Sequence, residues 1–99
     1  MLKLINLLVS LRRVPPLSEL TGDEERLLFE LKTLYDREGA LFVADVYGLP
    51  GTKSATTAYR QLIGLKDKGL VAVEVDQADR RRRHVYFTDL ANKVFSAVG

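Results

Sequence analysis

The stretch VDQADRRRRHVYFT, residues 75–88, places four consecutive arginines directly before a segment that alternates like a β-strand. Apolar residues occupy every second position before this tip, over residues 71–75, and recur after it at Val85 and Phe87. The sequence therefore predicts a two-stranded hairpin with a charged tip. Adjacent guanidinium groups repel one another unless an anion lies against them, so the tip is either a solvated loop or a contact with a polyanion. The four arginines are Arg80, Arg81, Arg82 and Arg83.

Between the N-terminal segment and the hairpin three helices are predicted, and a further one follows the hairpin. Thr21 and Glu24 have the spacing of a capping box, in which the threonine oxygen and the glutamate side chain satisfy backbone donors at a helix start. Ser54 or Thr52 can cap the third helix, and Thr88 can cap the last. The helices are predicted over residues 22–38, 43–47, 55–68 and 89–98.

Some interior positions carry further expectations. Gly64 weakens the third helix by up to about 1 kcal/mol relative to alanine unless another group packs closely there. Tyr35, Tyr47 and Tyr86 fall on apolar periodic positions, so we expect them to pack in the core rather than to bind a ligand. The apolar face of the last helix is predicted to comprise Leu90, Val94, Phe95 and Val98.

The N-terminal segment, residues 1–14, is apolar at most positions. It is too short to cross a bilayer and leads into two arginines rather than a small-residue cleavage site, so neither a membrane span nor a signal peptide is predicted. Its apolar residues cover more than one helical face, which favours a dimerisation helix over simple intramolecular packing. The predicted dimerisation residues are Leu4, Ile5, Leu8 and Leu11. Residues 17–99 then form the second unit of the chain.

The composition indicates an ordinary globular protein without catalytic or metal-binding motifs. With 46% hydrophobic and 28% charged residues, the 99-residue chain is typical of a single small domain. It contains no cysteine, which removes disulfides, thiolate zinc sites and cysteine nucleophiles, and fits the cytoplasm. Its single histidine, His84, lies in a predicted strand. We therefore predict no enzyme activity, no metal and no cofactor.

Charge is divided unevenly along the chain. Residues 15–48 carry a net charge of −5, whereas residues 49–85 carry +4. A basic half of this kind indicates a polyanionic partner.

The order of elements is that of a winged helix-turn-helix, an α+β fold with a three-helix core and a two-stranded β wing. The third helix of this fold enters the major groove of double-stranded DNA and needs polar side chains near its N-terminus. The candidates for this recognition helix are Ser54, Thr56, Thr57, Tyr59, Arg60 and Gln61. Lys53, in the turn before the helix, and the four wing arginines are candidates for contacts with phosphates or the minor groove.

The runs TTAYRQLIGLKDKGLV and VDQADRRRRHVYFT resemble the recognition helix and wing of MarR-type transcriptional regulators. The resemblance implies a homodimeric DNA-binding regulator, often a repressor, with interlocked terminal helices and a wing arginine in the minor groove. Asp76, Asp79 and Arg81 match the family's Asp-x-Arg-Asp-x-Arg wing pattern, and Ala78 stands in place of its first arginine. The turn over residues 51–54 is longer than the family's usual link, and the chain ends before a long C-terminal dimerisation helix.

Three functions remain open at this stage. The first is a sequence-specific transcriptional regulator acting as a homodimer, most simply a repressor. The second is a non-specific architectural or replication-type DNA-binding protein, favoured by the long arginine run. The third is a winged-helix protein-interaction module in which the arginines contact an acidic partner. Members of the resembled family often bind small effectors, and the sequence identifies none here.

Overall fold

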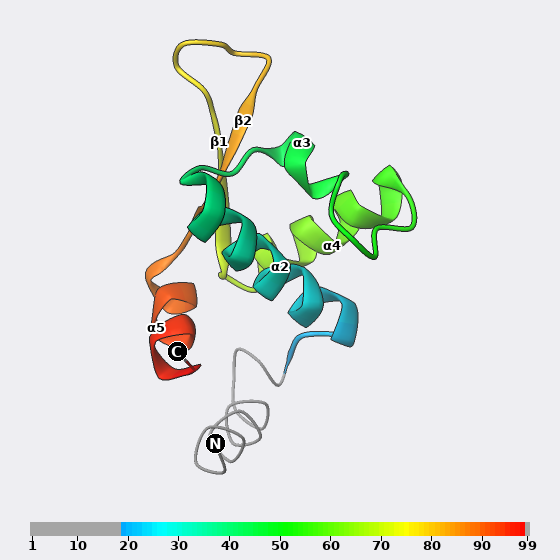
Figure 1. Cartoon of the computed structure of the whole chain (residues 1–99), viewed down its shortest axis with the longest axis vertical. Coiled ribbons are helices and arrows are strands. Elements are labelled where there is room, and N and C mark those ends of the chain that lie inside the picture. The colour runs from blue at the N-terminus through cyan, green and yellow to red at the C-terminus, as the bar shows by residue number, and fades with distance from the viewer. Residues whose placement is uncertain (1–18, 99) are drawn as a thin grey trace.

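The computed structural model describes residues 19–98, and its helices pack against the base of a small β-hairpin (Figure 1). The hairpin tip projects from one end of the molecule, and the last helix lies at the opposite end (Figure 1). The N-terminal dimerisation helix predicted over residues 1–14 lies outside the described residues. Within residues 19–98, no helix is long and apolar enough to cross a membrane.

The first described helix, α2 (Gly22–Glu38), begins and ends where the sequence predicts. The Glu24 backbone N–H donates to Thr21 Oγ1 over 3.1 Å, and the Thr21 N–H donates to Glu24 Oε1 over 2.9 Å, which completes the capping box. Gly39 follows the helix at φ 79°, a left-handed conformation that glycine adopts without steric cost.

Helices α3 (Val43–Val46) and α4 (Ala55–Asp67), with the turn between them, form the helix-turn-helix, and α2 packs against α4. Helix α3 is short, and α4 is the predicted recognition helix. Ser54 rather than Thr52 is the N-cap of α4. The Thr52 hydroxyl donates instead to the Val46 carbonyl over 3.2 Å, which ties the intervening turn to α3.

The wing consists of β1 (Val71–Val75) and β2 (Arg83–Phe87), paired antiparallel as predicted. Val73 lies opposite Val85 in the register. A third short segment, which the sequence analysis missed, joins β2 through an isolated bridge between Phe42 and His84. The Val85 N–H donates to the Leu41 carbonyl over 3.0 Å at this point. The wing is therefore attached to the segment that leads directly into α3.

The last helix, α5 (Asp89–Val98), is capped by Thr88, whose hydroxyl accepts from the Ala91 N–H over 3.2 Å. Ala91, Val94 and Phe95 are its buried residues. Leu90, predicted to lie on the buried face, is 39% exposed. The face that enters the core is thus rotated by one residue toward Ala91.

The core lies where α2, α3, α4, α5 and the hairpin meet. Its fully buried large side chains are Leu28, Leu31, Leu41, Leu62, Leu65, Leu70 and Val46. The three tyrosines predicted to be core residues are substantially exposed, with Tyr35 at 42%, Tyr47 at 39% and Tyr86 at 45%. Two of these rings still pack against other rings: Tyr35 contacts Phe87 edge to face, and Tyr86 stacks on His84.

Helices α2 and α4 pack closely at one point, where Glu24 lies over Gly64. A Cβ at position 64 would overlap the Glu24 carboxylate and come within 3.0 Å of its Cδ atom. Glu24 is buried and forms an ion pair with Lys68. Burial raises the pKa of Glu24, but the Lys68 ammonium and the Thr21 N–H outweigh it and hold this pKa below its usual value. Gly64 therefore provides the space for the buried carboxylate of a partly exposed ion pair.

Candidate nucleic-acid interface

The N-terminal end of α4 is held by its own side chains. The Ser54 hydroxyl accepts from the Thr57 N–H over 3.1 Å and donates to Thr57 Oγ1 over 2.9 Å. This cap satisfies a helix donor that would otherwise need water. Ser54 and Thr57, both candidates for base contact, are thus engaged with each other in the structure.

The remaining recognition-helix candidates fall on two sides of α4. Thr56, Tyr59 and Arg60 are exposed. Gln61 is only partly exposed and, together with Thr57, lines the crease between α4 and Asp23 of α2. The exposed side of α4 therefore presents a hydroxyl, a phenol and a guanidinium to solvent.

The wing turn is built around two aspartates. Asp76 Oδ1 accepts from the backbone N–H groups of Ala78, over 2.7 Å, and Asp79, over 3.2 Å. Asp79 Oδ1 accepts in turn from the Arg81 N–H over 3.1 Å. Asp76 Oδ2 contacts His84 Nε2 at 2.9 Å, so the turn is also joined to β2. Side-chain bonds to the backbone of this kind define a turn, and the tip is therefore more ordered than a plain solvated loop.

The wing turn should be sensitive to acid through Asp76. Hydrogen bonds from the Ala78 and Asp79 N–H groups and from His84 hold the pKa of Asp76 below its usual value. A lowered pKa in the folded state means that the carboxylate stabilises the turn fully above about pH 4, and that this contribution is lost as the pH falls through the folded pKa.

Asp76→Ala is therefore expected to speed amide exchange at Ala78 at neutral pH. As the pH falls below about 4, the difference in exchange between variant and wild type, corrected for intrinsic rates, should shrink. An equal difference at every pH would contradict this role of the carboxylate.

The four wing arginines, predicted as one group, have different surroundings. Arg80 forms no ion pair or hydrogen bond through its side chain among residues 19–98. Arg81 Nε lies 3.2 Å from Asp79 Oδ1. The Arg82 guanidinium lies 3.7 Å from the centre of the Phe42 ring, and that of Arg83 lies 5.7 Å from the centre of the Tyr59 ring. Arg83 therefore connects the wing to the exposed side of α4.

A groove of about 280 Å³ separates the wing from α3. Its basic wall consists of Arg81, Arg82 and Arg83, and its opposite wall includes Phe42 and Tyr47. Sequence reasoning missed Phe42 and Tyr47 because their position depends on the bridge between Phe42 and His84. Tyr47 is exposed, whereas Phe42 is half-buried under the Arg82 guanidinium, and Asp45 also lines the groove. An exposed ring beside guanidinium groups suits contact with nucleic acid, since it offers a stacking surface next to positive charge.

The cations of the two halves of the chain differ in how they are neutralised. On α2, Arg26 pairs with Glu30, Lys32 with Asp36 and Arg37 with Glu38. Lys53, Arg60 and Arg80, by contrast, form no ion pair within residues 19–98. Arg82 and Arg83 likewise form no ion pair within residues 19–98, and the same holds for Lys66 in the last turn of α4 and Lys93 of α5. Most of the cations that the described chain does not neutralise therefore lie on the N-terminal half of α4, in the turn before it and in the wing. Residues 19–98 contain no group of three or more His, Asp or Glu side chains placed to hold a metal ion.

Two solved structures share this arrangement. The transcriptional regulator Tm0710 from Thermotoga maritima superposes with a TM-score of 0.67 at 21% identity, covering 95% of this chain and 63% of its own. Reduced AbfR bound to DNA superposes with a TM-score of 0.58 at 24% identity, covering 81% of this chain and 58% of its own. The chain thus spans about three-fifths of the length of these proteins. The sequence matches no family model and has no significant similarity to curated proteins.

These likenesses confirm the fold that the order of elements and the MarR-type resemblance both predicted. The chain has an α+β winged helix-turn-helix fold in which α4 occupies the place of the recognition helix and the β1–β2 hairpin that of the wing. Fold alone does not define a function, so the functional conclusion rests on the chemistry of the α4 and wing surface.

Proposed function

We propose that this chain is a sequence-specific, double-stranded DNA-binding transcriptional regulator that acts as a homodimer and a repressor. The observation that carries the proposal is a set of exposed cations on the N-terminal half of α4, in the turn before it and in the wing that form no ion pair within residues 19–98, among them Lys53, Arg60 and Arg80. Duplex DNA is the polyanion that fits a protruding helix with a basic hairpin beside it. The proposed function also places the chain in the cytoplasm.

Each part of the surface has a distinct role in this proposal. Thr56, Tyr59 and Arg60 read base edges in the major groove, because they occupy the exposed side of α4. Lys53 contacts a phosphate next to the N-terminal end of that helix. The wing arginines follow the backbone or enter the adjacent minor groove, where a guanidinium is favoured by the narrow negative channel.

The homodimer is proposed from the N-terminal segment and from the MarR-type resemblance. An apolar helix over residues 1–14 would supply a self-association surface through Leu4, Ile5, Leu8 and Leu11. Two copies related by a twofold axis would read two half-sites about one helical turn apart. Repression then follows from occupying a promoter, and any small effector that relieves it is of unknown chemistry.

Arg60 is expected to contribute to discrimination rather than to general affinity. Arg60→Ala should reduce the preference for the best sequence by about 1–3 kcal/mol, the value of one bidentate guanidinium–guanine contact. The measurement is competition between the preferred duplex and a scrambled one for wild type and variant. A uniform loss of affinity for both duplexes would assign Arg60 to phosphate contact instead.

A non-specific architectural role is the second candidate function, because one observation favours it. Four consecutive arginines exceed what a single minor-groove contact requires, and they would strengthen backbone binding to any sequence. Selection from a random duplex library separates the two, since only a regulator enriches one sequence.

A further inference from the structure

The turn between α3 and α4 carries the first DNA-facing residues of the proposed interface. It comprises residues 47–54, between the end of α3 and the start of α4, and it ends in Lys53 and the N-cap Ser54. Its internal bonds tie it to α3: the Thr52 N–H donates to the Leu49 carbonyl and the Thr52 hydroxyl to the Val46 carbonyl, each over 3.2 Å. A connection of this length, held to a helix of only four residues, needs a further support if Lys53 is to keep one position.

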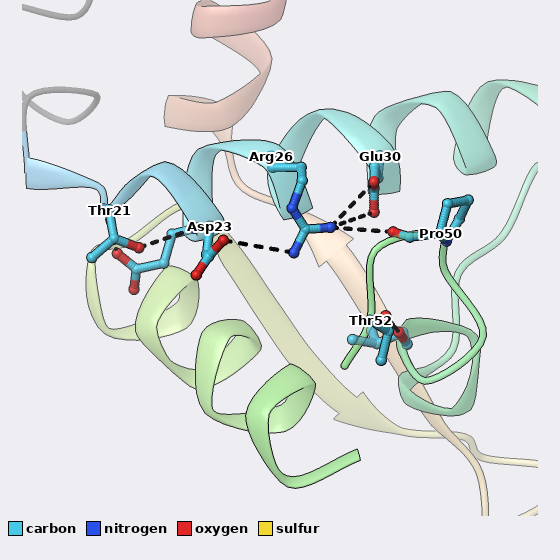
Figure 2. A network of polar contacts seen from close by, with 8 residues as sticks. Thr21, Asp23, Arg26, Glu30, Pro50 and Thr52 are labelled. Atoms are coloured by element: carbon cyan, nitrogen blue, oxygen red, sulfur yellow. Dashed lines mark hydrogen bonds and ion pairs between the residues drawn. The ribbon is translucent and has the colours of Figure 1, made fainter. Parts of the chain in front are cut away.

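Arg26 of α2 supplies a contact from across the fold. Figure 2 shows its guanidinium between the helix and the turn, where Nη1 donates to the Pro50 carbonyl over 3.2 Å. The same nitrogen lies 3.2 Å from both Glu30 oxygens, and Nη2 lies 4.0 Å from Asp23 Oδ1. Two carboxylates on the same helix thus orient the guanidinium toward the turn.

Gly51 shows that the turn backbone lies directly against this guanidinium. A Cβ at position 51 would come within 2.6 Å of Arg26 Nη1 and 3.2 Å of its Cζ. Gly51 also has φ 82°, a conformation that side-chain-bearing residues rarely adopt. The close approach and the hydrogen bond to Pro50 are separate contacts on adjacent residues.

Arg26 is poorly placed to bind DNA itself. Its charge is opposed by Asp23 and Glu30, and its side chain is only 34% exposed. Lys53, three residues beyond Pro50, has no such carboxylate partner within the described residues. Arg26, whose charge is neutralised by carboxylates, therefore holds the turn, and Lys53, whose charge is not, lies near the end of that turn.

We propose that Arg26 is a positioning residue for DNA binding: by holding Pro50 and Gly51 against α2, it fixes Lys53 and the N-terminal end of α4 relative to the wing. The proposal rests on the proposed function, because it assigns Arg26 a role in that same surface. Freeing the turn would leave the binding residues intact but would add an ordering cost to each binding event.

The direct test compares Arg26→Ala with Arg37→Ala. Arg37 is a matched control because it lies on the same helix, carries the same charge and pairs only with the neighbouring Glu38 among the described residues. For the preferred duplex, Arg26→Ala is expected to weaken binding about tenfold without changing the salt slope, because no phosphate contact is lost. Arg37→Ala is expected to bind as the wild type does. A salt slope lowered by about one in Arg26→Ala would overturn the proposal, since Arg26 would then contact phosphate itself.

Gly51→Ala provides a second test that does not depend on removing the arginine. When introduced into the otherwise wild-type chain, Gly51→Ala is expected to displace the Arg26 guanidinium and to reduce DNA affinity as Arg26→Ala does. In an Arg26→Ala background its effect should be smaller, because only the backbone strain at position 51 remains. Additive effects of the two substitutions on affinity would overturn the proposal.

Amide exchange at Thr52 separates the failure of this proposal from that of the proposed function. Arg26→Ala should speed exchange at Thr52, whereas Arg37→Ala should not. If the wild-type protein does not bind duplex DNA, the proposed function fails. The role of Arg26 in DNA binding then fails with it, even if slow amide exchange at Thr52 shows that Arg26 holds the turn. If wild type binds DNA and the two arginine variants bind equally well, only the positioning role fails.

Discussion

Replacing the four wing arginines, Arg80 to Arg83, with alanine is expected to weaken binding to duplex DNA by about 100-fold or more near physiological salt. Each arginine that neutralises a phosphate releases counterions and contributes about 0.9 to the slope of log affinity against log salt concentration. The variant should therefore lower that slope by about two to four. Titration of one labelled duplex at several salt concentrations measures both quantities.

A variant with lysine at the same four positions is the matched control. It keeps the charge but lacks the planar, bidentate guanidinium, so the salt slope should be retained while minor-groove contacts are weakened. Circular dichroism should show that both variants remain folded, because the four side chains are exposed. If the alanine variant binds with an unchanged salt slope, the wing does not contact the DNA backbone.

Gly64→Ala is expected to destabilise the fold by about 2 kcal/mol, although helix propensity alone predicts a gain of up to about 1 kcal/mol. The new methyl group would displace the Glu24 carboxylate and separate it from Lys68. Denaturant unfolding of wild type and variant measures the difference. Gly22→Ala is the control, because a Cβ at position 22 meets nothing within 4 Å and should change stability little.

The same prediction has an internal check in the Glu24→Ala background. With the carboxylate removed, alanine at position 64 no longer displaces anything, and its ordinary helix propensity should make the double variant more stable than Glu24→Ala alone. If Gly64→Ala costs the same in both backgrounds, the glycine serves some purpose other than admitting Glu24.

Helix boundaries could be predicted from the sequence because they depend on chemistry within a few residues. The Thr21–Glu24 capping box, the Thr88 cap and the left-handed glycine at position 39 all act locally. The wing strands could be predicted for the same reason, because apolar residues alternate over residues 71–75 and 83–87. Val75, on the same alternating face as Val71, is nevertheless 51% exposed, because it lies at the end of β1 next to the wing tip. These local signals sufficed for the fold.

The contacts that organise the candidate interface could not be predicted in this way, because they join distant residues. The Arg26 bond to the Pro50 carbonyl spans 24 positions, and the ion pair of Glu24 with Lys68 spans 44. No turn residue or alternating pattern in the sequence indicates the bridge between Phe42 and His84. This bridge brings Phe42 next to the wing, where the Arg82 guanidinium lies over its ring. The exposed tyrosines were misplaced because periodicity shows which side of an element faces the core but not how far a long ring reaches.

The most direct measurement is selection of the chain's preferred duplex from a randomised library near physiological salt, where non-specific binding is already weakened. A sequence-reading homodimer predicts recovery of a palindrome with half-sites about one helical turn apart. Retention without enrichment of any sequence, or no retention at all, would contradict sequence-specific recognition by this surface.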